Sequence, residues 1–489
     1  MKIFLYFCFL ITFSFSYSSG RLVFLYTHFR HGARGPKQLD ENYIDRLGEK
    51  WTNLGELTGV GERMHYLLGL KNRKKYIEED GLISEKFDPH QILIFTSDKN
   101  RTMLSCYSQL QGLFPQRENL GEELSIQQEA NAYPPILDNI EEKDADIEKA
   151  INELNSSALP YRMMLAPARM VNENEIKMNV HDIGECAEKT DKLKDENLKI
   201  QELKDVTNEF NEKYAKKLNK YFNKEKAKFK AKTIKKICND FLSDYTDNRN
   251  MAEFKEKTGL DFKILKQDCL DFYKQYYIYA HYGDEGKLIA HIESSKIMRE
   301  LLFYMKRRLD TDISDIDEDS HYEDYSRPRW LMISGHESTV SADLVIIIKA
   351  LGLNMQTAFY FPRFASQLAL EVRTDKEKCE NYKDYYIVGY FDNDEIFNVR
   401  ADEFINKIEN EIWTNQQVDE YCGFYSKSDD IIDNNAYKIL FIISSCLLQK
   451  MDWLNLAVLA FLFIGTVFAS FIWISYDVLQ KNRTLGRDF

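Results

Sequence analysis

The fold of this 489-residue chain is decided by a short stretch, Arg30-His31-Gly32-Ala33-Arg34-Gly35-Pro36. An apolar run at 22–29 precedes it and predicts a strand, so the histidine lies at a strand end between two guanidinium groups. A histidine that attacks phosphate needs an unprotonated ring nitrogen and fixed positive charge beside it. Arginine supplies that charge well because its planar fork binds two phosphate oxygens together. Glycine after the histidine predicts a close approach of backbone and ligand.

Two later segments repeat the pattern of a strand followed by a helix. The apolar run 91–96 is followed by Arg101 and a helical pattern, and the run 330–334 is followed by His336, Glu337 and a second helical pattern. Taken singly, such residues are most often a solvated charge or a surface turn. In open parallel sheets, however, ligands bind beyond the carboxyl ends of the strands, where helix N-termini add partial positive charge. We therefore expect these three side chains near His31.

The motifs at these three junctions together resemble a known family. Arg-His-Gly-x-Arg-x-Pro at 30–36 resembles the signature of the histidine acid phosphatases. The segment 97–102 (Ser-Asp-x-x-Arg-Thr) resembles the family's second arginine segment, and 333–340 resembles its distal histidine-acid segment. Downstream, 362–368 resembles the strand entry that follows in animal acid phosphatases. The resemblance implies an α/β fold, with a mixed, mainly parallel sheet flanked by helices (phosphoglycerate mutase-like) and an inserted helical cap.

The resemblance also implies a role for each motif residue. His31 would be the nucleophile that forms a phosphohistidine, and Glu337 would protonate the leaving group. Aspartate is usual in the family where Glu337 stands; glutamate has a similar reference pKa and a longer reach. The remaining site residues would bind the phosphate: Arg30, Arg34, Arg101 and, as a further donor, His336. No metal or cofactor is expected, since the arginines take over a metal's electrostatic task and no cysteine or histidine spacing fits zinc.

Between the second and third junctions the chain becomes charged and helical in pattern, and we expect the cap insertion at about 120–328. From Ile200 onward the apolar positions recur three to four residues apart, which predicts one amphipathic helix. Its many lysines are typical of a solvated helix face, with a basic surface near anionic lipid or substrate as the alternative.

The two ends of the chain predict its cellular placement. Residues 1–19 have the charged start, short apolar core and small-residue exit of a secretory signal peptide, with an N-terminal membrane anchor as the alternative. The apolar stretch 454–476 predicts one transmembrane helix, with a buried core helix as the alternative, and 477–489 would be a cytosolic tail. Residues 20–435 would then form a luminal or extracellular domain of a type I protein, lysosomal, endosomal or at the cell surface. Asn155 is the expected glycosylation site in it.

Seven cysteines remain after removal of the signal peptide, and in a secretory compartment most would pair. Cys238 and Cys269 lie close within one helical region, so we expect them to be bonded. The family resemblance implies a second bond between Cys186 and Cys422. Cys106 lies in an apolar helical stretch and is expected to be a buried free thiol.

The sequence therefore predicts an acid phosphomonoesterase that hydrolyses small phosphate monoesters on the luminal side of a membrane, with an acidic pH optimum. The net charge of −13 argues against nucleic acid as a partner. A homodimer is left open. The alternatives are a catalytically weak or inactive receptor-like ectodomain with the same fold, and a phosphatase of phytase-like or lysophospholipid type.

Overall fold

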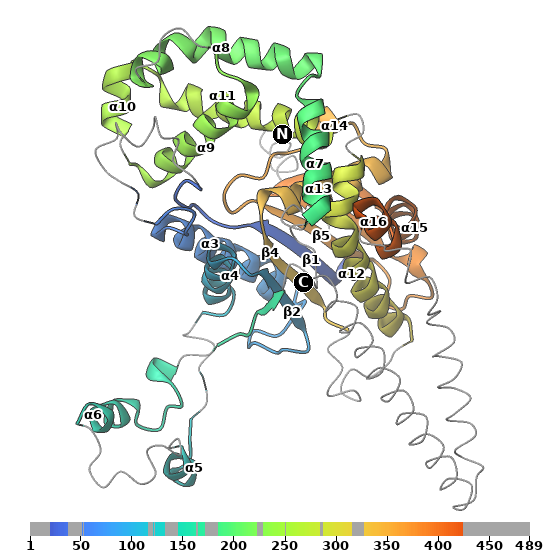
Figure 1. Cartoon of the computed structure of the whole chain (residues 1–489). Helices are drawn as coiled ribbons and strands as arrows, with labels where there is room; N and C mark the ends of the chain where they lie inside the picture. Colours follow the sequence, from blue (N-terminus) through green and yellow to red (C-terminus); the bar gives the residue numbers. More distant parts are fainter. Residues whose placement is uncertain are drawn as a thin grey trace, which may run out of the picture. The chain divides into compact units, whose positions relative to one another are not determined.

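The architecture was obtained from a computed structural model of the chain (Figure 1). It describes residues 20–37, 51, 53–115, 121, 123–132, 145–162, 165–171, 184–222, 228–249, 251–283, 287–314 and 327–423. The predicted signal peptide, the predicted span 454–476 and the tail 477–489 lie outside these residues. Within the described part of the chain, none of the helices has the length and hydropathy that crossing a bilayer requires.

The described residues contain one mixed, seven-stranded sheet. Its strands are β1 (Arg21–Arg30), β2 (Ile92–Ser97), β3 (Arg169–Val171), β4 (Trp330–Gly335), β5 (Gln367–Thr374), β6 (Tyr386–Phe391) and β7 (Asp394–Arg400). Their order is β3-β2-β4-β1-β5-β6-β7. The pairings from β3 to β1 are parallel, and those from β1 to β7 are antiparallel. The prediction of a mixed sheet is therefore confirmed. The prediction that the sheet is mainly parallel is wrong, because three of its six pairings are parallel and three are antiparallel. The parallel half carries the three motif junctions.

β1 is the central strand, and its sequence shows why. Nine of its ten residues are buried, and apolar side chains dominate both faces. β4 pairs with it on one side and β5 on the other. A strand that is covered on both faces has a continuous apolar sequence rather than an alternating one. The predicted strand 22–29 has such a sequence. The nucleophile candidate His31 thus directly follows the central strand of the sheet.

Helices cover both faces of the sheet. The helical elements outside the insertion are α3 (Gly59–Asn72), the π-helical η1 (Arg73–Glu79), α4 (Asn100–Leu113), α13 (Glu337–Leu351), α14 (Met355–Ala358), the 3₁₀ turn η7 (Tyr382–Asp384), α15 (Ala401–Glu411) and α16 (Asn415–Cys422). Successive residues of β4 alternate between two apolar cores: Trp330 and Met332 pack with η1 and α4, whereas Leu331 and Ile333 pack with α13 and α15. This alternation is the two-residue period of a pleated strand.

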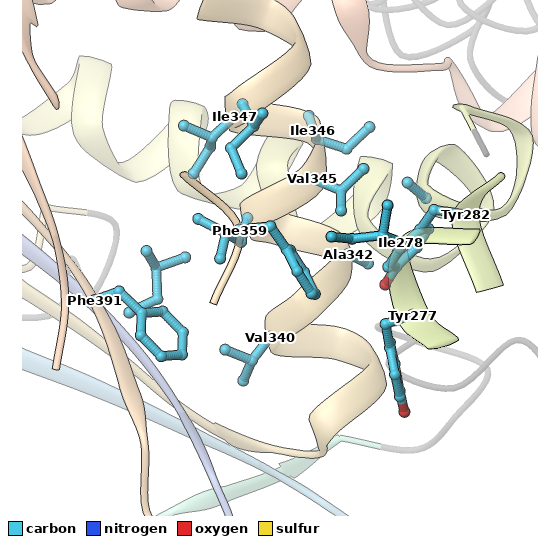
Figure 2. Packing of buried hydrophobic residues seen from close by; sticks show 14 of the residues in the cluster. Tyr277, Ile278, Tyr282, Val340, Ala342, Val345, Ile346, Ile347, Phe359 and Phe391 are labelled. Carbon is cyan, nitrogen blue, oxygen red and sulfur yellow. The ribbon is translucent and has the colours of Figure 1, made fainter. Parts of the chain in front are cut away.

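α13 is buried on nearly all sides, and most of its residues are apolar. Ten consecutive residues from Thr339 to Ile348 are buried. Figure 2 shows its side chains between Phe391 of β6 on one side and Tyr277, Ile278 and Tyr282 on the other. A helix held this firmly fixes the position of its own first turn, and that turn carries Glu337.

The insertion between α4 and β4 is largely helical. Its elements are α5 (Ile126–Asn131), α6 (Ala145–Leu154), the 3₁₀ turn η3 (Pro160–Arg162), α7 (Gly184–Asn197), α8 (Gln201–Phe222), α9 (Ala231–Asp247), α10 (Met251–Thr258), α11 (Phe262–Tyr276), the π-helical η5 (Tyr277–Tyr282) and α12 (Lys287–Ser314). The amphipathic helix expected from Ile200 is α8, and its apolar stripe is buried. The insertion also supplies β3 to the sheet edge, and α12 packs against β1 and α13.

Two disulfides tie the helical insertion together and to the end of the described chain. Cys186 of α7 is bonded to Cys422 of α16, and Cys238 of α9 is bonded to Cys269 of α11. These are the two predicted pairs. Cys106 is a buried free thiol, as predicted, and burial raises its pKa to about 12. Asn155 is exposed in a turn with φ of 51°, and its glycosylation stays a prediction.

Candidate active site

The three junctions converge at the carboxyl ends of the parallel strands. His31 follows β1, Arg101 is the second residue of α4, and His336 and Glu337 begin α13. The imidazole centroids of His31 and His336 lie 5.6 Å apart. Arg101 Nη2 lies 3.5 Å from His336 Nδ1. The structure therefore brings together side chains that are up to 306 residues apart in the chain.

His31 is completely buried and has one occupied and one open ring nitrogen. Its Nδ1 lies 2.9 Å from the carbonyl oxygen of Gly32, which can only accept, so Nδ1 carries the proton. Its Nε2 makes no hydrogen bond to any residue that the structure describes. Burial, with the charges of Arg30 and Arg34, holds the pKa of His31 well below its usual value, although Glu337 opposes this shift. The Nε2 lone pair is thus available for attack.

Arg30 lies between the nucleophile candidate and an aromatic surface. Its Nη1 donates to the carbonyl oxygen of Pro362 at 2.9 Å, and its Nε lies 3.2 Å from Glu337 Oε2. Its guanidinium carbon lies 4.5 Å from the ring centroid of Phe364 and 5.8 Å from that of Phe361. A cation on an aromatic face is stabilised without using its N–H donors. Arg30 is therefore fixed in orientation and still has donors for a ligand.

Arg34 is almost fully enclosed and is held from two directions. Its Nη1 donates to the carbonyl oxygen of Gly35 at 2.7 Å, and its Nη2 donates to Asn239 Oδ1 of α9 at 3.1 Å. Burial and the nearby cations Arg30 and Arg101 lower the pKa of Arg34 to about 10, against the opposing effect of Glu337. A buried guanidinium that is held by neutral oxygen acceptors favours an incoming anion.

The second histidine is linked to the second junction. His336 Nε2 lies 3.1 Å from Ser97 Oγ, and its Nδ1 faces Arg101 at the limit of hydrogen-bonding distance. Burial and the charge of Arg101 keep the pKa of His336 well below its usual value. In the free site this imidazole therefore uses both nitrogens within the protein. Because a guanidinium can only donate, Nδ1 accepts from Arg101. It can donate to a phosphate oxygen only when that oxygen replaces Arg101 and Nδ1 has gained a proton.

Glu337 is the carboxylate of this cage, and its side chain is 16% exposed. Its Oε2 lies 3.8 Å from His31 Nε2 as well as 3.2 Å from Arg30 Nε. Burial alone would raise its pKa, but Arg30, Lys37 and Arg34 outweigh burial and hold the pKa well below its usual value. This shift favours the ionised carboxylate of Glu337 in the free site.

A buried polar network supports the turn that carries His336. Thr339 Oγ1 accepts from the backbone N–H of His336 and lies 3.1 Å from His28 Nε2. His28 Nδ1 lies 2.7 Å from Asp343 Oδ2, and both side chains are fully buried. A Cβ added at Gly335 would lie 2.5 Å from His28 Nε2, so only glycine fits there. The central strand and α13 are thereby locked together directly behind the site.

The glycine that follows His31 has a different task from the one expected. A Cβ at Gly32 would lie 2.5 Å from the backbone oxygen of Gly61 in α3, and one at Gly61 would meet the backbone of Ala33. The close approach is therefore between two protein segments rather than between backbone and ligand. It brings the first turn of α3 against the loop 30–36.

Several residues of the site could not be found from the motifs. Asn239, which orients Arg34, lies in the helical insertion with no pattern to mark it. Phe364 lies within a segment that the sequence singled out, but its contact with Arg30 has no local signature. Among the described residues, no group of histidine, cysteine and carboxylate side chains has the geometry of a metal site.

Comparison with known proteins agrees with this geometry. The family model described as histidine phosphatase superfamily (branch 2) matches residues 21–392. Putative acid phosphatase 5 of Caenorhabditis elegans is 36% identical over 94 residues, 19% of this chain and 21% of the relative. Lysosomal acid phosphatase of Xenopus laevis is 31% identical over 97 residues, 20% and 22% of the two chains. Human prostatic acid phosphatase is 35% identical over 96 residues, 19% and 24% of the two chains.

These curated relatives are matched over only about a quarter of their length or less, whereas solved structures match over most of the chain. A phytase of Hafnia alvei, in complex with myo-inositol hexakis sulphate, superposes with a TM-score of 0.51 at 12% identity, covering 81% of this chain and 98% of the phytase. A phytase of Klebsiella sp. ASR1 superposes with a TM-score of 0.50 at 13% identity, covering 81% and 95%. At such identities the likeness shows a shared fold.

Proposed function

We propose that this chain, which belongs to branch 2 of the histidine phosphatase superfamily, hydrolyses phosphate monoesters through a phosphohistidine on His31. One observation carries the proposal. The Nε2 atom of His31 is buried, unprotonated and without a hydrogen bond to any described residue, while Nδ1 is fixed by Gly32 and cationic groups lie beside the ring. The nucleophilic atom of His31 thus forms no hydrogen bond with the described residues and lies beside the charges of Arg30 and Arg34.

In the first step, Nε2 of His31 attacks phosphorus in line with the ester oxygen. The N–P bond forms as the P–O bond to the leaving group breaks. Arg30, Arg34 and Arg101 hold the equatorial oxygens and spread the developing charge, the main source of catalysis in phosphoryl transfer. The imidazole becomes cationic on phosphorylation, and the carbonyl oxygen of Gly32 stabilises that cation through Nδ1–H.

Glu337 is the proton donor of this step. Its carboxyl group transfers a proton to the departing alkoxide, so that the alcohol leaves neutral. In the second step water attacks the phosphohistidine, the N–P bond breaks, and the Glu337 carboxylate takes the proton that the water loses. Inorganic phosphate then leaves, and His31 is again neutral.

Because Glu337 is ionised in the free site, its proton must arrive with the substrate. Phosphate monoesters have a second pKa of about 6, so their monoanion carries that proton under acidic conditions. The value of kcat/KM should therefore fall as pH rises above about 6, because the protonated form of the substrate disappears. This gives an acidic optimum, in agreement with an acidic lumen. The two disulfides support a secretory compartment as the place of folding.

The proposal is tested by trapping the intermediate. The purified full chain is incubated with a ³²P-labelled aryl phosphate at acid pH and quenched in alkali, in which phosphohistidine persists. We expect label on the wild type and none on His31→Ala, whose turnover should also be lost. His90→Ala, at a half-exposed histidine before β2, is the matched control and should behave as wild type. Turnover by His31→Ala at the wild-type rate would refute the proposal; an inactive wild type would favour a receptor-like ectodomain.

A further inference from the structure

Ser105 is fully buried in α4, and its hydroxyl group contacts the loop that carries the nucleophile. The backbone N–H of Gly32 donates to Ser105 Oγ at 3.0 Å. The Ser105 hydroxyl in turn donates to the carbonyl oxygen of Arg101, one helical turn earlier, at 2.6 Å. A hydroxyl group that donates its proton can still accept, so both bonds form together. Ser105 therefore joins the His31 loop to the helix that carries Arg101.

The backbone around the nucleophile is held from three directions. The N–H of His31 donates to the carbonyl oxygen of Gly335, at the end of β4, at 3.0 Å. The carbonyl oxygen of His31 accepts from the N–H of Ala365 at 3.2 Å. The next N–H along the chain, that of Gly32, donates to Ser105. The peptide unit between His31 and Gly32 is therefore fixed at both its oxygen and its nitrogen.

The bond to Ser105 bears on the chemistry because Gly32 also orients the imidazole. The carbonyl oxygen of Gly32 accepts from Nδ1 of His31 at 2.9 Å, which leaves Nε2 as the nitrogen with the lone pair. Glycine has no Cβ to restrict its dihedral angles, so the direction of this carbonyl group depends on how the preceding peptide unit is anchored. Ser105 supplies that anchor, and it acts on Nε2 through Gly32.

α4 is itself firmly attached to the sheet and to α3. Ser334 Oγ of β4 donates to the carbonyl oxygen of Thr102 at 2.8 Å, and Thr102 Oγ1 lies 2.7 Å from Ser97 Oγ of β2. The helix also packs closely on α3, since a Cβ added at Gly112 would lie 2.1 Å from the backbone oxygen of Tyr66. A hydroxyl group on a helix that is held in this way can hold the loop in one position.

We infer that Ser105 is a positioning residue for the nucleophile: its hydroxyl group holds the His31–Gly32 peptide unit so that Nε2 of His31 is directed at phosphorus. The inference rests on the proposed function. In-line attack requires a precise position of the attacking atom, and a misplacement of about 1 Å can slow a reaction by about a hundredfold. The bond from Ser105 to Arg101 is to the backbone, so the guanidinium group can bind phosphate without the Gly32 bond. Loss of Ser105 should therefore slow attack and spare phosphate binding.

The test compares the full chain with its Ser105→Ala variant, which lacks the acceptor for the Gly32 N–H. Each protein, in excess over a ³²P-labelled aryl phosphate at acid pH, is quenched rapidly in alkali, and the rate at which the protein gains label is followed. The inhibition constant of inorganic phosphate measures binding to the arginines without attack. In Ser105→Ala we expect labelling to slow by about ten- to a hundredfold, with the inhibition constant within about twofold of that of the wild type.

Two further variants on α4 isolate the bond to Gly32. Ser108 Oγ donates to the carbonyl oxygen of Leu104 at 2.7 Å, so Ser108 makes the same bond within the helix as Ser105 does. Ser108→Ala is therefore the matched control, and both of its values should equal those of the wild type. Ser105→Thr is the conservative variant, because a helical threonine can also place its Oγ against the carbonyl group four residues earlier. It should restore labelling to within about threefold of the wild-type rate.

The outcomes separate this inference from the proposed function. If the wild type gains no label, the proposed function itself fails. If the wild type is labelled and Ser105→Ala is labelled equally fast, the phosphatase stands and the positioning role is wrong. The positioning role is also wrong if Ser105→Ala weakens phosphate binding by the factor by which it slows labelling, or if folded Ser105→Thr is as slow as Ser105→Ala.

Circular dichroism and the melting temperature establish that each variant is folded. If Ser105→Ala does not fold, Ser105→Cys takes its place, because a thiol has a similar size and is a weaker acceptor. Its labelling rate should then lie below that of the wild type, and a rate equal to that of the wild type would overturn the inference.

Discussion

Replacement of His65 tests how the site region responds to the acidic pH at which the chain is expected to work. His65 lies in α3 and is fully buried. Its Nδ1 lies 3.1 Å from Gln109 Oε1 of α4, and the centroid of its ring lies 5.1 Å from that of Phe29. Burial lowers its pKa from 6.5 to about 4, although the hydrogen bond with Gln109 opposes the shift. At pH values between about 4 and 6.5 the imidazole is neutral in the folded protein and charged in the unfolded chain.

The sign and size of the effect follow from this difference. The unfolded chain binds the extra proton, so the contribution of His65 is complete above pH 6.5 and is lost as pH falls toward 4. At pH 5 the loss covers 1.5 pH units, or about 2 kcal/mol at 1.36 kcal/mol per unit. His65→Asn keeps a side chain that can bond to Gln109 and cannot titrate. Its free energy of unfolding should therefore fall about 2 kcal/mol less than that of the wild type between pH 7 and pH 5.

Urea denaturation of both proteins at pH 7 and pH 5, without phosphate, measures the two differences. The comparison is between changes with pH, so any constant destabilisation by the substitution cancels. Other buried histidines, such as His31 and His336, contribute equally to both proteins. Equal pH dependence of wild type and variant would refute the reasoning, because it would mean that His65 gains its proton in the folded state or has no unusual pKa.

Two further predictions concern catalysis. Glu337→Gln cannot donate a proton, so kcat for alkyl phosphates should fall by about 10² to 10⁴. The kcat for 4-nitrophenyl phosphate, whose leaving group needs no proton, should fall far less. Steady-state kinetics on both esters measures the two losses, and equal losses would remove the general-acid role. Asn239→Ala removes the hydrogen bond of 3.1 Å to Arg34. A hydrogen bond to a charged group contributes about 1.5–3 kcal/mol, so kcat/KM should fall by roughly tenfold or more. An unchanged kcat/KM would count against any part of Asn239 in phosphate binding.

The motifs predicted more of the site than of the surrounding fold. The side chains that meet at the site each lie at or just beyond the carboxyl end of a parallel strand, and the local sequence specifies that position. They are Arg30, His31, Arg34, Arg101, His336 and Glu337. The local sequence does not specify the partners of these residues. Asn239 and Phe364 act through tertiary proximity, and a lone asparagine or phenylalanine carries no periodic signal. The antiparallel half of the sheet, β5 to β7, likewise depends on pairings that no motif specifies.

The glycine at 32 illustrates why a correct motif can carry a wrong reason. Its presence was explained by room for a ligand, which is the common use of glycine beside a reactive side chain. The structure shows instead that the first turn of α3 fills that room, with the backbone of Gly61 against Gly32. Sequence alone cannot separate these cases, since both require the absence of a Cβ. Only the position of a segment distant in the chain decides between them.

The electrostatics of the cage link the binding of phosphate to the protonation that the mechanism requires. In the free site the pKa values of both imidazoles and of Glu337 lie well below their usual values, which favours neutral rings and an ionised carboxylate. The guanidinium groups of Arg30, Arg34 and Arg101 then carry positive charge that Glu337 balances only in part. A phosphate group reduces that excess and, by the same Coulomb interactions, raises the pKa of Glu337. In the proposed mechanism the substrate thereby favours the protonated acid that its own cleavage needs. In the empty site the arginines lower the pKa of Glu337 and so favour its ionised form.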